Sequence, residues 1–106
     1  MRVPGVDFQL VQSLVPMASV LDLLGIEVRH RKSSQIHGPC PVHKSQSKRS
    51  RSFSVNVATG LCCCHKCGFA GNPIQLWAKI KGMTVYAAAI DLCHQAGVDV
   101  PWVERW

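Results

Sequence analysis

Four side chains suited to binding a metal ion occur as two short pairs. Cys40 pairs with His43 and Cys64 with Cys67, and twenty residues separate the two pairs. Zinc prefers thiolate and imidazole ligands, and a structural site takes four of them in a tetrahedron. Each pair fits one tight turn, so a single ion would close the long loop between them. The spacing predicts a closed site with Zn²⁺ as the cofactor, and His37 is the best substitute for His43.

The other cysteines are interpreted as structural residues. Residues 62–64 are consecutive cysteines, and alternate side chains of a strand face opposite ways, so only the middle one should point away from Cys64. Cys62 and Cys63 are therefore expected to be apolar strand residues. Cys93, on a later helical segment, is expected in the core.

Positive charge is concentrated in the middle of the chain. The 106 residues carry a formal net charge of +6, yet no Asp or Glu occurs between Val28 and Ile90, where ten of the twelve Lys and Arg residues lie. A field of one sign favours a polyanionic partner, and phosphate backbones are the commonest, although a merely solvated basic surface is the alternative. The expected nucleic-acid contacts are Arg29, Arg31, Lys44, Lys48, Arg49, Arg51 and Lys66 on phosphates, although charge alone does not distinguish DNA, RNA or an acidic protein. Phe53 shares a strand face that should be mostly core, but an exposed Phe53 could stack on an unpaired base.

The pattern of apolar residues and helix caps predicts an α+β fold, a small antiparallel zinc-ribbon sheet flanked by short N-terminal and C-terminal helices. Helices are expected at 6–15, 17–24, 73–81 and 85–96, and strands at 26–31, 35–38, 53–57 and 61–64. Apolar stripes expected in the core include Val20, Leu21, Leu23 and Leu24, and later Val85, Ala88, Ala89, Leu92, Cys93 and Ala96. The sequence predicts one domain, 1–106, made of a helical segment (1–25), a zinc ribbon (26–71), a helical pair (72–97) and a tail (98–106).

The chain also resembles the N-terminal zinc-binding domain of bacterial DnaG-type DNA primases over roughly residues 17–101. The similarity rests on Cys40-Pro41-Val42-His43, Ser52-Phe53-Ser54-Val55, Cys64-His65-Lys66-Cys67-Gly68 and Gly71-Asn72-Pro73-Ile74. The resemblance implies that Cys40, His43, Cys64 and Cys67 are the ligands. It also implies that the ribbon helps a primase engage its single-stranded DNA template from outside the catalytic site.

The chain itself is expected to be non-catalytic. Primases of this type carry a second domain whose acidic residues hold Mg²⁺, whereas the six acidic residues here are scattered and form no paired pattern. The expected partners are DNA, with single strands favoured, and a primase catalytic domain, a helicase or another replication protein.

No membrane partner is expected, since the sequence has neither a signal peptide nor a membrane-spanning run. We expect a cytoplasmic, nucleoid-associated location in a bacterial or phage context. Two other functions remain open. One is a protein-interaction ribbon that docks a replication or transposition protein without binding DNA. The other is a small redox enzyme that uses Cys64 and Cys67.

Overall fold

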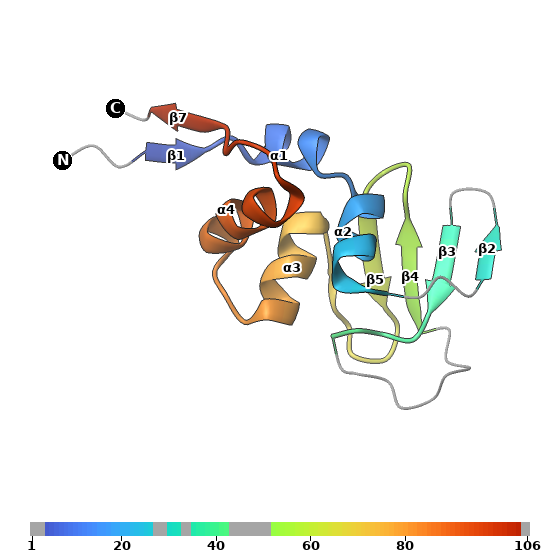
Figure 1. Ribbon diagram of the computed structural model, residues 1–106. Helices are drawn as coiled ribbons and strands as arrows, with labels where there is room; N and C mark the ends of the chain where they lie inside the picture. The colour runs from blue at the N-terminus through green and yellow to red at the C-terminus, as the bar shows by residue number, and fades with distance from the viewer. Residues whose placement is uncertain (1–3, 27–29, 33–34, 43–51, 105–106) are drawn as a thin grey trace.

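A computed structural model describes residues 4–26, 30–32, 35–42 and 52–104 (Figure 1). Within these residues the elements follow the order β1 (Pro4–Val6), α1 (Phe8–Leu14), α2 (Met17–Leu24), β2 (His30–Lys32), β3 (Gln35–Gly38), β4 (Phe53–Asn56), β5 (Leu61–Cys64), β6 (Ala70–Gly71), α3 (Pro73–Lys81), α4 (Val85–Ala96) and β7 (Trp102–Glu104). Antiparallel sheets flanked by helices confirm the predicted α+β class. In the described part of the chain, no helix is long and apolar enough to span a membrane.

The main sheet has five antiparallel strands in the order β2-β3-β4-β5-β6. Strands β4 and β5 form the predicted hairpin, in which Phe53 pairs with Cys64 and Val55 with Cys62. The turn is held by the side chain of Asn56, whose Oδ1 accepts hydrogen bonds from the N–H groups of Ala58 (2.9 Å) and Thr59 (3.1 Å). Because strand side chains alternate, one face of the sheet joins the hydrophobic core and the other is open.

Helices α3 and α4 pack together and end where the sequence predicts. Asn72 caps α3 in a capping box with Gln75, and Thr84 caps α4 through its hydroxyl. The two helices are joined by a hydrogen bond of 2.8 Å from Trp77 Nε1 to Asp91 Oδ2. This side-chain bond ties the two helices to each other.

The ends of the described chain form a second, two-stranded sheet that the sequence did not predict. Strand β1 pairs antiparallel with β7, with Val6 opposite Trp102. The N–H of Asp7 also donates to the carbonyl of Pro101 at 2.9 Å. The expected tail at 98–106 is therefore partly a strand, and the first helix begins at Phe8 rather than Val6 because Asp7 caps it. Figure 1 places this pair beyond α1 and α4, away from the main sheet.

The prediction of a strand at 26–31 was partly wrong. Gly25 adopts a left-handed conformation with φ 68°, and the N–H of Ile26 donates to the carbonyl of Leu21 at 3.0 Å. This bond places Ile26 in the C-terminal cap of α2 rather than in a strand. Strand β2 occupies His30–Lys32, so Lys32 belongs to the strand instead of the expected turn. Residues 27–29 and 33–34 lie outside the described residues.

Two residues expected in the core are exposed. Leu23 is 40% exposed because α2 buries the face carrying Met17, Val20 and Leu21, and a residue two positions after Leu21 points the other way. Val85 is 43% exposed because it stands in the first turn of α4. Cys93 is fully buried, as predicted.

Candidate metal centre

Three of the four predicted ligands converge in the structure. Cys40 follows β3, Cys64 ends β5, and Cys67 lies in the turn after β5. Their Sγ atoms all lie within 4.8 Å of one another, and Cys40 Sγ is 3.8 Å from Cys67 Sγ. Sulfur atoms bound at about 2.3 Å to one tetrahedral ion lie about 3.8 Å apart. The three thiols therefore have the identity and spacing of a zinc site.

The backbone after β5 builds the turn that carries the second pair. The N–H of Cys64 donates to the carbonyl of Phe69 at 2.7 Å, and the N–H of Gly68 donates to the carbonyl of Cys64 at 3.0 Å. Gly68 has φ 76°, a left-handed conformation that glycine adopts without steric cost. The N–H of Cys67 approaches Cys64 Sγ at 3.5 Å. These contacts turn the Cys67 thiol back toward Cys64.

The protein environment favours the thiolate form of Cys64. Burial alone raises its pKa, but hydrogen bonds from the backbone of Cys67 and Lys66, and then from the Cys67 and Cys40 side chains, lower the pKa to about 6. A thiolate is the form that binds zinc, so this cysteine reaches its ligand state without alkaline conditions.

Cys62, two residues earlier, has the opposite environment. Burial, reinforced by the neighbouring Cys63, raises its pKa to about 12. Its thiol approaches the carbonyl of Gly71 at 3.5 Å. Cys62 therefore remains a protonated core residue, as its place in the sequence predicts. Burial also raises the pKa of Cys93.

The described residues supply three of the four predicted ligands. His43 lies outside them. His37 is described, but it is not part of the cluster formed by the three thiols. It alternates with the buried Ile36 and Gly38 and pairs with Ser54 across β3 and β4. The structure thus gives no support to His37 as the substitute ligand.

The predicted DNA contacts fall into three groups. Lys66 is exposed in the turn between Cys64 and Cys67, and the backbone of Arg31 lies in β2. Phe53 is only 2% exposed, so its predicted stacking on a base is wrong, because its side chain belongs to the core face of β4. The remaining predicted contacts, Arg29, Lys44, Lys48, Arg49 and Arg51, lie outside the described residues.

The open face of the sheet contains a hollow that the sequence analysis missed. Its volume is about 420 Å³, and its lining is uncharged and mostly apolar surface, with a few polar side chains at its edge. Leu61 is 57% exposed there, and Ser54 Oγ donates to Gln35 Oε1 at 3.3 Å. The alternation of polar residues along β3 and β4 could have indicated this face. The lining residues are Gln35, Ser54, Asn56, Thr59, Leu61, Cys62, Cys63, Ala70 and Gly71.

A model of the CHC2 zinc-finger family matches residues 6–105. The chain belongs to this family. The CHC2 domain is similar to the DNA primase of Rickettsia prowazekii, with 31% identity over 71 residues, or 67% of this chain and 12% of the primase. It is also 26% identical to the DNA primase of Staphylococcus epidermidis over 96 residues, which cover 90% of this chain and 16% of that protein. These findings confirm the predicted membership among DnaG-type zinc-binding domains.

A solved structure agrees with the fold. The Aquifex aeolicus primase, described as its zinc-binding and RNA polymerase domains, aligns with a TM-score of 0.71 at 18% identity. The alignment covers 90% of this chain and 22% of the other. The CHC2 domain therefore spans less than a quarter of each of these primases.

Proposed function

We propose that this CHC2 domain binds one zinc ion through Cys40, His43, Cys64 and Cys67, and that the ion holds a sheet that binds single-stranded DNA. The observation that carries the proposal is the convergence of three thiol sulfurs within 4.8 Å. A zinc ion with four protein ligands has no open position for water, so it contributes folding free energy rather than catalysis.

The protein ligands join parts of the chain that are distant in sequence. Cys40 follows the C-terminal end of β3, and Cys64 and Cys67 lie at the C-terminal end of β5. Strand β4 lies between β3 and β5, so the ion would connect two strands that do not pair with each other. Cys40 and Cys64 are 2% and 3% exposed, so water is kept from these two thiols, while Cys67 lies on the exposed side of the cluster. The closed site would hold the hairpin rigid beneath the open face.

The open face has the groups needed to contact bases. Asn56 Oδ1 is occupied by two backbone N–H groups, so its amide nitrogen remains a donor for a base edge. Leu61 offers an exposed apolar surface beside it, and the hollow of about 420 Å³ has no charged group among its described lining residues. Unpaired bases present both a flat apolar surface and hydrogen-bonding edges, which a duplex hides.

Phosphates would be contacted by cations of the basic segment between Val28 and Ile90. Lys66 is exposed, and we retain Arg29, Arg31, Lys44, Lys48, Arg49 and Arg51 as proposed contacts. The domain would thus act as a non-catalytic template-binding module, in replication alongside a catalytic domain or a helicase. Its six scattered acidic residues support the absence of a magnesium site of its own.

The test is fluorescence anisotropy of the zinc-loaded protein with labelled single-stranded and duplex DNA across a salt series. We expect tighter binding to single strands. Leu61→Glu should weaken this binding about tenfold or more, because it replaces an apolar base contact with a like charge near phosphates. Leu10→Glu is the matched control, since Leu10 is 44% exposed on α1 and outside the open face.

Three results would contradict the proposal in different ways. Equal affinity for single strands, duplex and heparin would remove the single-strand preference. Equal behaviour of Leu61→Glu and Leu10→Glu would place the DNA elsewhere on the domain. A stable stoichiometric partner protein with no DNA affinity at all would favour the protein-interaction alternative.

A further inference from the structure

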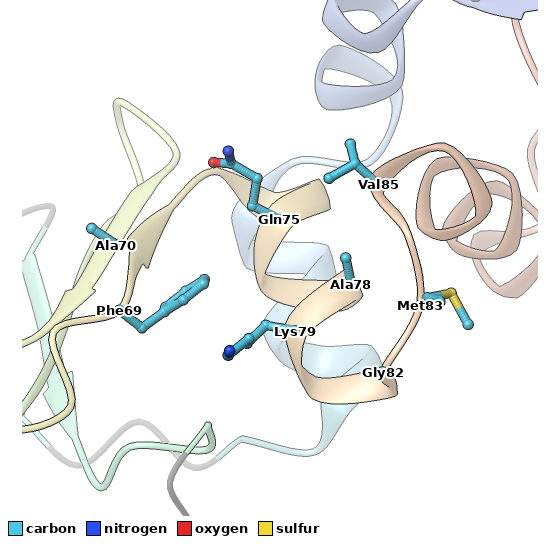
Figure 2. A pocket seen from close by; sticks show the side chains of 8 residues that line it. All are labelled: Phe69, Ala70, Gln75, Ala78, Lys79, Gly82, Met83 and Val85. Atoms are coloured by element: carbon cyan, nitrogen blue, oxygen red, sulfur yellow. The ribbon is translucent and has the colours of Figure 1, made fainter.

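A second hollow lies away from the three thiols, over the outer side of α3. It is an open groove of about 480 Å³ between the start of β6 and the connection from α3 to α4. Figure 2 shows Phe69 and Lys79 on one side, Met83 and Val85 on the other, and Ala78 between them. The lining residues are Phe69, Ala70, Gln75, Ala78, Lys79, Gly82, Met83 and Val85.

The walls of this groove combine apolar side chains, several of them partly exposed, with a nearly equal share of polar surface. Val85 is 43% exposed although it is a large aliphatic residue, and Phe69 and Met83 are only partly buried against the core. A volume of about 480 Å³ falls within the range of sites that bind small ligands or a few side chains. The groove therefore offers space for an apolar anchor.

The charge of the groove has one sign. Among the described residues that line it, Lys79 alone is charged, and Lys81 follows two residues later in the last turn of α3. All lining residues belong to the stretch from Val28 to Ile90, which contains no Asp or Glu. An occupant with negative charge around an apolar side chain would complement this surface.

One wall is ordered before any partner binds. Gln75 Oε1 accepts a hydrogen bond from the N–H of Asn72 at 2.9 Å, and Asn72 Oδ1 accepts one from the N–H of Gln75 at 2.8 Å. Gly71 permits this close packing, because a Cβ there would lie 2.7 Å from Gln75 Oε1. A preformed wall lowers the ordering cost of binding.

We propose that this groove docks an acidic peptide segment of a partner protein, with one apolar side chain held against Phe69, Ala78 and Val85 and a carboxylate beside Lys79. A peptide fits better than a nucleic acid strand. A phosphate track needs several cations along its length, whereas the described lining supplies one cation between aliphatic walls. The proposal is independent of the DNA-binding role of the open face.

The experiment is an NMR titration of the full zinc-loaded chain, observed through the methyl groups of Met83 and Val85. The probe is a synthetic peptide with one phenylalanine between two pairs of aspartates, added to about 1 mM, the range of weak specific binding. We expect both methyl signals to shift, and we expect little shift with the peptide in which lysines replace the aspartates.

Two variants locate the contact. Val85→Glu places a carboxylate at the groove and should weaken peptide binding about tenfold or more. A carboxylate in the first turn of a helix is tolerated, so the fold should persist. Leu10→Glu makes the same change at the 44% exposed Leu10 in the first turn of α1 and should leave the affinity unchanged. Lys79→Gln should weaken binding and reduce its salt dependence.

The outcomes separate this proposal from the proposed DNA binding. Val85→Glu should leave the affinity for single-stranded DNA unchanged. No methyl shift with the acidic peptide, equal shifts with the lysine peptide, or equal binding by Val85→Glu and Leu10→Glu would each overturn the docking proposal. A titration in which single-stranded DNA shifts Met83 and Val85, while the acidic peptide does not, would assign the groove to DNA instead.

Discussion

At the scale of single residues, two buried cysteines on one face of β5 differ in their chemistry. The pKa of Cys64 is lowered to about 6, whereas that of Cys62 is raised to about 12. Desolvation by burial is the main cause of the raised pKa of Cys62. At Cys64, desolvation is outweighed by hydrogen bonds from the backbone of the following turn and from neighbouring thiols. The turn thus selects which thiol is prepared for a metal.

Replacing this ligand should remove zinc and with it much of the fold. Structural zinc contributes folding free energy of order ~10 kcal/mol, and Cys64→Ser takes away a buried thiolate. We expect loss of bound zinc, measured by elemental analysis, and loss of the cooperative thermal transition. Cys63→Ser is the matched control, because Cys63 is the half-buried neighbour outside the thiol cluster. An unchanged melting curve and zinc content for Cys64→Ser would refute the ligand assignment.

The low pKa of Cys64 also predicts how acid affects the site. Its folded pKa of about 6 lies below the ordinary value of 9.0, so its contribution to stability is fully present above pH 9 and is lost as pH falls through about 6. Protons should therefore displace zinc only below about pH 6, followed with a chromogenic zinc chelator during acid titration.

Cys62→Ser is the control for this titration. The Cys62 thiol stays protonated over the whole range, so its replacement should not move the midpoint of zinc release. A midpoint above pH 7 would contradict the thiolate environment described for Cys64.

At the scale of elements, a buried side-chain hydrogen bond joins α3 to α4 within their apolar interface. Trp77 is 2% exposed, and its Nε1 donates to Asp91 Oδ2 at 2.8 Å. The Nζ atom of Lys81 also lies 5.1 Å from the centre of the Trp77 ring, within range of a cation–π contact. The hydrogen bond joins the middle of α3 to the middle of α4, and the lysine contact lies within α3.

Removing the acceptor should destabilise the helical pair without affecting the metal. Asp91→Ala leaves the indole N–H of Trp77 buried without its partner, and such a loss costs about 1–3 kcal/mol. We expect a lower urea midpoint for the zinc-loaded protein with unchanged zinc content. Asp99→Ala, at an exposed position, should have little effect. Equal midpoints for the two variants would mean that the bond contributes nothing measurable.

The elements also indicate which parts of the fold were predictable. Caps and turns are local, so Asn72 and Thr84 identified α3 and α4 from the sequence, and the expected turn at 58–60 identified β4 and β5. Pairing between the chain ends is not local, and β1 with β7 was missed. The exposure of Leu23 and Val85 depends on which helix covers them, which periodicity alone does not specify.

The candidate site was predictable to a similar extent. Ligand spacing identified Cys40, Cys64 and Cys67, which the structure brings together, because paired ligands in tight turns are a local pattern. Phe53 lies on the sheet face that packs against the helices, so its predicted stacking on a base was wrong. The groove beside α3 arises from the approach of β6 to the helical pair, so no short motif indicates it.

At the scale of the whole molecule, one arrangement connects the proposed activities. The main sheet has a core face against the helices and an open face with the uncharged hollow, while the thiol cluster lies at the end of β5. Ala70 lines both hollows, so the proposed DNA face and the proposed peptide groove meet at β6. A zinc-held module of this kind would bring a template and a partner protein to neighbouring surfaces.

The central claim is that one zinc ion is held by Cys40, His43, Cys64 and Cys67. Zinc K-edge X-ray absorption on the zinc-loaded protein tests it most directly, because sulfur and nitrogen ligands differ in distance. We predict three sulfur ligands at about 2.3 Å and one nitrogen at about 2.0–2.1 Å. Loss of the nitrogen ligand in His43→Ala, but not in His37→Ala, would identify the histidine. A shell with fewer than three sulfurs, or with a water ligand in the unmodified protein, would contradict the account.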